Sequence, residues 1–138
     1  MPMPRDIEAR RYYRAAQQRL EDGQLILTKL KRPAAAIYLT GYAVECILKA
    51  LLLSATPVSS RVESLREFRG AAGHDLAGLS EKLGARGVRM PPGTARALNY
   101  VTSWSVSLRY EPGPGNPEAA KRFIESARAV MDWAERRL

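Results

Sequence analysis

The sequence predicts an all-α fold, an antiparallel up-and-down bundle of four to five helices. Three observations support this prediction. Apolar residues recur at a spacing of three and four near both ends of the chain, which is the period of a helix with one buried face. A segment between them is apolar on nearly every face, as expected for the central helix of a bundle. Prolines and glycines separate these segments and leave room for short helix connections.

The composition fits a single helical domain over residues 1–138. The length is that of one domain, and 46% apolar residues are ordinary for a packed core. Cys46 is the only cysteine and lies inside an apolar run, so no internal disulfide can form and we expect a cytoplasmic protein. The start of the chain lacks a secretory signal pattern. With one histidine and one cysteine, a His and Cys zinc site cannot form within a protomer, and we expect no cofactor.

The first predicted helix contains a repeated stripe of apolar or small residues at Tyr13, Ala16, Leu20, Gly23, Leu27 and Leu30. Gly23 costs about 1 kcal/mol of helix propensity relative to alanine, so it marks either a close helix crossing or a weak point. Pro33 is expected to end this helix, because proline cannot be accommodated in a helix interior.

The second predicted helix runs from Ala34 to about Ser54 and is long enough to span a bilayer. It contains Glu45 and Lys49, however, and each charge near the centre of a span costs about 2.5 to 3.5 kcal/mol. We therefore predict a central core helix and no membrane association.

The remaining segments predict shorter helices and one long one. Brief helices are expected near 60–68 and 76–83, with a turn at 70–73 between them. Thr94 is a plausible N-cap for a helix that uses Ala97, Leu98, Val101, Trp104 and Leu108, although residues 103–108 also alternate like a strand. We predict a helix there, because no partner strand is evident. Asn116 and Pro117 predict the start of a last helix that continues to the chain end.

The charge pattern is the first functional signal. The chain carries 22 Lys and Arg against 14 Asp and Glu, a net charge of +8, with seventeen arginines and five lysines. Arginine is a planar bidentate donor suited to phosphate or carboxylate, but an arginine-rich composition alone gives the same balance, and the basic residues are spread along the chain. No Gly-rich phosphate loop, dinucleotide fingerprint or nucleophile elbow occurs, which disfavours nucleotide-hydrolysing and hydride-transfer folds.

Four residues could carry chemistry. Glu45 and Lys49 are four apart on the most apolar helix, so they can form either a structural ion pair or part of a site. His74 is the only imidazole, and Asp75 after it could cap the next helix. Arg69 lies five positions before His74 across a glycine-rich turn, so the two side chains could face one phosphate.

Several segments together resemble the HEPN domain, the nucleotide-binding domain of higher eukaryotes and prokaryotes. The resemblance covers most of the chain and rests on residues 12–16, residues 36–51, Gly73-His74-Asp75-Leu76, Trp104 and Arg109-Tyr110. It implies an all-α bundle that commonly forms a homodimer with a cleft between protomers. It also implies a place in toxin–antitoxin, defence or RNA-processing systems, often beside a minimal nucleotidyltransferase partner.

Many members of that family are metal-independent ribonucleases with an arginine followed, four to six residues later, by a histidine. Arg109 matches the place of that arginine, but no histidine follows it. We therefore predict a binding module for nucleotide, RNA phosphate or a nucleotidyltransferase partner, and no catalysis. Its predicted site residues are Arg109, Tyr110, Glu45, Lys49, Trp104 and His74. The alternative is a ribonuclease toxin that uses Arg69 or Arg109 with His74.

Overall fold

The computed structural model of the chain describes residues 3–138, except for the side chain of Arg109. The described residues form six α-helices and three short 3₁₀ helices: α1 (Ile7–Thr28), α2 (Pro33–Ala55), η1 (Val58–Ser60), α3 (Arg61–Phe68), η2 (Ala71–His74), α4 (Leu76–Ala85), α5 (Pro92–Val101), η3 (Val106–Tyr110) and α6 (Pro117–Glu135). The predicted all-α class is confirmed. The two brief helices expected near 60–68 and 76–83 both form, as α3 and α4, and with the other four they give six helices rather than four to five.

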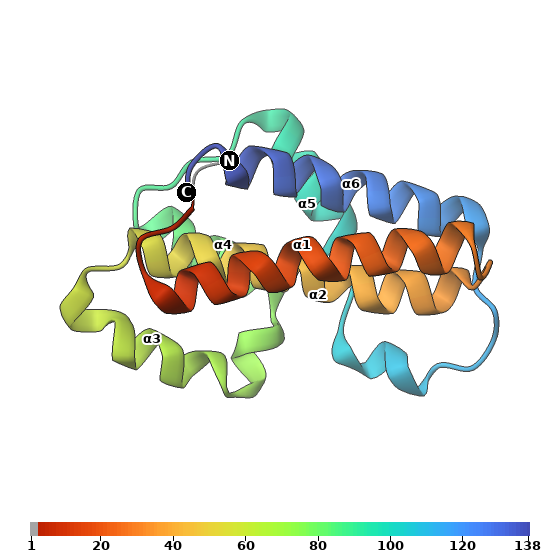
Figure 1. Ribbon diagram of the computed structural model, residues 1–138, viewed down its shortest axis with the longest axis horizontal. Coiled ribbons are helices and arrows are strands. Elements are labelled where there is room, and N and C mark those ends of the chain that lie inside the picture. Colours follow the sequence, from red (N-terminus) through yellow and green to blue (C-terminus); the bar gives the residue numbers. More distant parts are fainter. Residues whose placement is uncertain (1–2) are drawn as a thin grey trace.

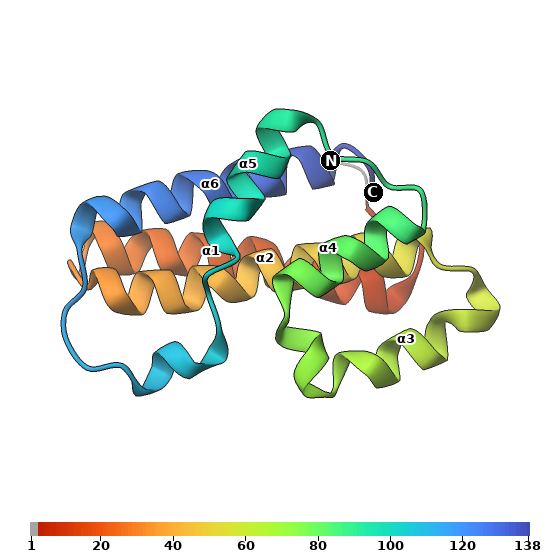
Figure 2. The same ribbon diagram turned by 180° about the vertical axis from the view of Figure 1, so that it is seen from behind.

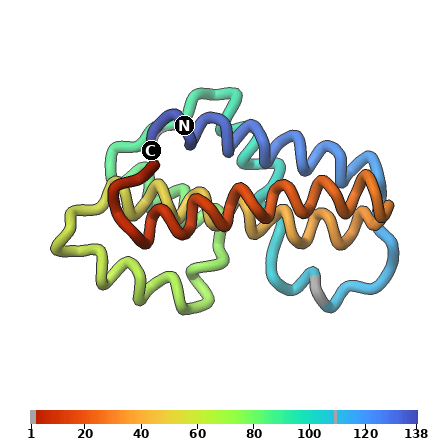
Figure 3. Tube along the Cα trace, viewed as in Figure 1, coloured from red at the N-terminus to blue at the C-terminus, as the bar shows by residue number. Residues whose placement is uncertain are grey.

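Two antiparallel helices, α1 and α2, form the centre of the molecule (Figure 1). The helices α5 and α6 cover one side of this pair. The segment with α3 and η2, and the separate loop with η3, both extend from the opposite side, as the reverse view also shows (Figure 2). The Cα trace shows that the start of the described chain lies close to the C-terminal end (Figure 3). The side of α1 and α2 that faces α3 and η3 is therefore the side that α5 and α6 leave open.

The helix α2 is the core of the bundle, as predicted. Its most apolar stretch has a mean hydropathy of 1.6, high enough for a membrane span by composition, but 72% of that stretch is buried inside the protein. One stripe along α2 is only partly covered, at Ala35, Tyr38, Leu39, Tyr42 and Cys46. These positions follow the helical repeat of three and four, so they share one face. We call them the open stripe.

The connection between α1 and α2 differs from the prediction. The helix α1 ends at Thr28, and Pro33 begins α2 instead of ending α1. Lys31 adopts a left-handed backbone conformation with φ of 55°, which turns the chain before Pro33. Leu30 is consequently 62% exposed and does not join the buried stripe of α1. Proline suits the first turn of a helix because the N–H that it lacks has no partner there.

Gly23 marks the close crossing of α1 and α2. A Cβ atom at this position would lie 2.1 Å from Thr40 Oγ1 and 3.3 Å from the Ala36 carbonyl oxygen. Of the two interpretations of Gly23, the structure therefore supports the close crossing. The cost in helix propensity is offset by the near approach of the two backbones.

The predicted helix through Trp104 and Leu108 is wrong at both ends: its N-cap is Pro91 rather than Thr94, and it ends before Trp104. The helix α5 ends at Val101, and residues 106–110 form the 3₁₀ helix η3, so the strand alternative is wrong as well. Trp104 is 3% exposed and its indole Nε1 donates a hydrogen bond of 2.9 Å to the Tyr38 carbonyl oxygen. The indole ring lies against Gly41. The chain leaves the helix so that this ring can pack on α2.

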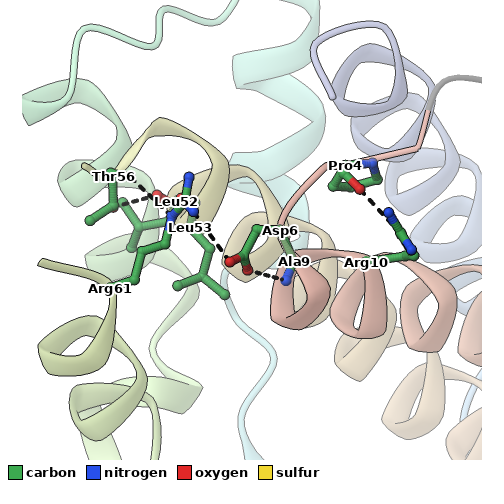
Figure 4. Close-up of polar contacts among 8 residues, drawn as sticks. All are labelled: Pro4, Asp6, Ala9, Arg10, Leu52, Leu53, Thr56 and Arg61. Carbon is green, nitrogen blue, oxygen red and sulfur yellow. Dashed lines mark hydrogen bonds and ion pairs between the residues drawn. The ribbon is translucent and has the colours of Figure 1, made fainter. Parts of the chain in front are cut away.

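A hydrogen-bonded junction fixes the start of α3 to both central helices (Figure 4). Asp6 caps α1 by accepting a 2.8 Å hydrogen bond from the Ala9 N–H, and its other oxygen lies 3.3 Å from Arg61 Nη1. Arg61 Nε also donates to the carbonyl oxygens of Leu53 and Thr56, at 3.2 Å each. A cation at these carbonyls stabilises the end of α2. One arginine thereby joins α1, α2 and α3.

Replacing Gly41 with alanine is expected to destabilise the protein by about 1–3 kcal/mol, because the new Cβ would lie 2.0 Å from Trp104 Nε1 and the indole would have to move. The matched control is Gly84→Ala in α4, where nothing lies within 4 Å of the added Cβ. That variant is expected to be more stable by about 0.5–1 kcal/mol. Urea unfolding measures both, and equal stability of the Gly41→Ala variant and the unchanged protein would contradict the packing described here.

Candidate functional site

Two buried charged side chains of α2, Glu45 and Lys49, form a cluster with the partly exposed His74. Lys49 Nζ donates a 3.0 Å hydrogen bond to Glu45 Oε2, so the predicted i,i+4 pair is confirmed. Glu45 is 4% exposed and Lys49 is 3% exposed. The second carboxylate oxygen, Glu45 Oε1, lies 2.7 Å from His74 Nδ1. One buried carboxylate therefore holds a lysine of its own helix and a histidine from η2.

The Lys49 ammonium group also lies between two aromatic rings. Its Nζ atom is 5.6 Å from the centre of the Tyr12 ring and 5.2 Å from the centre of the Phe68 ring. These rings meet edge to face, with centres 5.7 Å apart. Aromatic faces attract a cation that has lost its water. The cluster thus joins α1, α2 and the end of α3 around one charge.

The turn at η2 places His74 against Glu45. Gly73 is required there, because a Cβ atom would lie 2.2 Å from the Phe68 carbonyl oxygen. The His74 side chain remains 39% exposed. A carboxylate only accepts hydrogen bonds, so we assign the imidazole proton to Nδ1, and Nε2 is then the ring nitrogen that can accept a hydrogen bond or a proton.

An aromatic row connects His74 to the loop that carries η3. The Tyr42 ring lies edge to face against the His74 ring at 6.4 Å and against the Trp104 ring at 4.8 Å. The hydroxyl groups of Tyr38 and Tyr42 are 3.1 Å apart. Tyr38 and Tyr42 belong to the open stripe, so the imidazole lies at the edge of the uncovered face of α2.

A groove of about 510 Å³ adjoins the cluster on the same side of the molecule. Residues from α1, from α2 and from the end of α3 line it: Glu8, Arg11, Tyr12, Ala15, Cys46, Leu65 and Arg69. Tyr12 is the direct link, since it lines the groove and also packs on Lys49. Burial, and then the nearby Cys46 and Glu8, raise the pKa of Tyr12. Its hydroxyl therefore stays protonated near neutral pH and can donate a hydrogen bond. We call this space the arginine groove.

Cys46 lines the arginine groove but is a poor nucleophile. Burial, with a smaller contribution from the Glu45 carboxylate, raises the pKa of the Cys46 thiol from 9.0 to about 11. The thiolate is the reactive form of cysteine, and it is scarce at neutral pH. The partly buried Cys46 side chain therefore serves as an apolar wall of the groove.

The residues predicted for the site fall into three groups. Glu45, Lys49 and Trp104 are buried, and the Trp104 ring packs against α2. His74 and Arg69 reach the surface, His74 beside the open stripe and Arg69 in the arginine groove. Tyr110 is 74% exposed on η3. The side chain of Arg109 lies outside the described part of the chain.

Sequence reasoning missed four residues near the site, all of them recognisable only in three dimensions: Arg11, Tyr12, Tyr42 and Phe68. Tyr12 and Tyr13 are neighbours in the chain, but Tyr13 is 1% exposed in the core whereas Tyr12 faces the groove. Helical periodicity identified Tyr13 and could have placed Tyr12 on the adjacent face. No sequence pattern indicated Phe68, since its position depends on how α3 packs against α1 and α2.

The fold and this site define a small helical domain built on a Glu–Lys–His cluster. A family model for the HEPN domain matches residues 8–137, nearly the whole chain. The chain therefore belongs to the HEPN domain family, as its resemblance predicted. No match is found among curated proteins or solved structures.

Replacing Glu45 with glutamine is expected to destabilise the protein by about 3–5 kcal/mol, because it leaves the buried Lys49 charge without its partner. The matched control is Glu67→Gln. Glu67 also lies 3.0 Å from a lysine, Lys82, but these two side chains are 50% and 40% exposed. That exposed pair is expected to contribute at most about 1 kcal/mol. Urea unfolding compares the two variants, and a Glu45→Gln effect as small as the control would contradict a buried ion pair.

Alkylation of Cys46 by iodoacetamide is expected to be about a hundredfold slower at pH 8 than that of a cysteine with the ordinary pKa, because the thiolate is that much rarer. The rate should increase about tenfold per pH unit up to pH about 11. A rate that levels off near pH 9 would show that the pKa is not raised and that only access is restricted.

Proposed function

We propose that this chain is a HEPN module that binds the phosphate of a nucleotide or of RNA in the arginine groove, next to the Glu45–His74 pair. One observation carries the proposal. Two arginines, Arg11 and Arg69, line a groove of ligand size that shares Tyr12 with the buried cluster. Small-molecule sites are commonly 300–1,000 Å³, and the arginine groove is about 510 Å³.

The charges of the groove suit an anion. Arg69 forms no ion pair within the described residues, and Arg11 is paired only loosely with Glu8, at 3.8 Å with its side chain 80% exposed. Both guanidinium groups can therefore turn to a phosphate and bind it through two N–H groups. Tyr12 offers a hydroxyl, and the half-buried Leu65 and Cys46 give an apolar wall for a base or ribose.

The buried residues hold this site in place. Glu45 orients His74 and pairs Lys49, whereas Lys49 supports the rings of Tyr12 and Phe68. We assign Glu45, Lys49 and Trp104 to positioning, and Arg69 and His74 to ligand contact. Tyr110, exposed on η3, belongs to the proposed site as a contact for a longer RNA across the open stripe. Arg109 stays a proposed ligand contact on the family resemblance alone, because its side chain lies outside the described residues.

Family membership supports three further proposals. These are a homodimer with the ligand cleft between protomers, a minimal nucleotidyltransferase partner, and a toxin–antitoxin or defence context. A dimer through the open stripe would cover Tyr38, Leu39 and Tyr42, which α5 and α6 leave partly exposed. A cytoplasmic location also remains a prediction.

Replacing Arg69 with alanine is expected to weaken binding of uridine monophosphate at least about tenfold, the loss expected for one charge-assisted contact to phosphate. Isothermal titration measures the dissociation constant. The matched control is Arg66→Ala, an exposed arginine one turn earlier on α3 that does not line the groove. Equal binding by the Arg69→Ala variant and the unchanged protein, or equal losses in both variants, would refute the groove as the site.

A metal-independent ribonuclease is the second candidate, and one observation favours it. Glu45 holds Nδ1 of the only imidazole and leaves Nε2 able to take up a proton, which is how a general base is oriented. Incubation with total RNA separates the candidates, using the unchanged protein beside His74→Ala, Arg69→Ala and Arg109→Ala variants. Cleavage that disappears with His74→Ala supports the enzyme, and RNA left intact by every protein supports the binding module.

A further inference from the structure

One stretch of the chain has charges of a single sign. Residues 82–110 contain five lysines and arginines and no aspartate or glutamate. The stretch runs from the end of α4 to η3, and within it the linker from α4 to α5 and the whole of α5 lie on the side of the molecule away from α3 and η3 (Figures 1 and 2). Arg89 and Arg96 are exposed there. The linker and α5 therefore add only positive charge to this side of the molecule.

Two arginines of α6 and the chain end complete this surface. The Arg122 guanidinium lies 4.2 Å from the centre of the Tyr100 ring, and Arg137 lies 5.3 Å from that of Trp133. Arg137 Nη2 also donates a 3.2 Å hydrogen bond to the Arg89 carbonyl oxygen. A guanidinium that stacks on a ring keeps its N–H groups available at its edge, in a fixed orientation.

These contacts place four arginines along the line where α5 meets α6: Arg89, Arg96, Arg122 and Arg137. Arg96 is one helical turn before Tyr100 and so shares the face that Arg122 contacts. At the other end of the line, Arg89 meets Arg137. The residues from Arg122 to Arg137 span about 22 Å at the helical rise. We call this line the arginine seam.

The arginines of the seam are not engaged in ion pairs within the described residues. The helix α6 also carries Glu118, Glu125 and Asp132, yet none of them forms an ion pair with a seam arginine. Cations held in a row without partners leave their N–H groups available for an external anion.

We propose that the arginine seam is a second binding surface, which follows the backbone of single-stranded nucleic acid. A flexible strand with one phosphate per nucleotide can meet several cations spaced over about 22 Å. Tyr100 and Trp133 are already covered by guanidinium groups, so bases have no free ring to stack on at these two positions, and recognition depends on the backbone. The surface lies opposite the arginine groove and does not depend on the function proposed for that groove.

The test measures binding of a fluorescent oligouridylate, long enough to span the seam, at a series of salt concentrations. The triple variant Arg89→Gln, Arg96→Gln and Arg122→Gln is expected to bind at least about tenfold more weakly. In a plot of log affinity against log salt concentration, its slope should be shallower by about 2, since each of the three lost phosphate contacts to a single strand contributes about 0.7 to the slope. The same three positions changed to lysine keep the charge, so that variant should keep the slope.

The matched control removes three exposed cations elsewhere, with Lys29→Gln, Arg32→Gln and Arg66→Gln. It has the same net charge as the seam variant and is expected to keep the slope. Equal losses in the two variants would show a general effect of net charge and would overturn the proposal. An unchanged slope in the seam variant would also overturn the proposal. The same holds if the seam variant binds oligouridylate as the unchanged protein does and loses binding only to vesicles of anionic lipid. Circular dichroism confirms that each variant is folded.

A negative result for the arginine seam can be distinguished from a negative result for the arginine groove. Uridine monophosphate is too small to span the seam, so its binding depends on Arg69 and is expected to be unchanged by the seam substitutions. Loss of oligouridylate binding with retained uridine monophosphate binding supports both sites.

Discussion

The fold and the site both depend on the double contact made by the Glu45 carboxylate. A buried carboxylate is costly unless it is paired and hydrogen-bonded, and both oxygens of Glu45 are used, one by Lys49 and one by His74. Lys49 in turn supports Tyr12 and Phe68. The carboxylate thus determines where η2 and the end of α3 lie. The walls of the arginine groove follow from that placement.

The lobe that carries α3 is attached at both of its ends by charged groups. At its start, Arg61 binds Asp6 and two carbonyl oxygens at the end of α2. At its end, Phe68 packs against Tyr12 and Lys49, and His74 follows after one turn. Such anchoring suits a binding site, because ligand contacts are more specific when their supports are fixed. Within the described residues, no hydrogen bond or ion pair holds the Arg96 side chain of the seam, and the seam suits a less specific, salt-dependent contact with a strand.

The sequence was sufficient for the features that local rules determine. The apolar repeat predicted α1 and α6, and the continuous apolar segment predicted α2. Asn116 predicted the start of α6, and the four-residue spacing predicted the Glu45–Lys49 pair. It was insufficient where long-range packing decides. The end of α5 depends on the fit of Trp104 against Gly41, which lies more than sixty positions earlier in the chain. Likewise, nothing near His74 in the chain indicates that Glu45 is its partner.

The most direct test of this account uses the fact that His74 is the only histidine. Nitrogen-15 spectra of the imidazole ring report which nitrogen carries the proton in the neutral form. We expect a protonated Nδ1 that exchanges slowly with water, and an Nε2 with the shift of an unprotonated ring nitrogen. Substitution Glu45→Gln should remove the slow exchange. A neutral ring that is protonated at Nε2, with the same spectrum in both proteins, would contradict the central role given to Glu45.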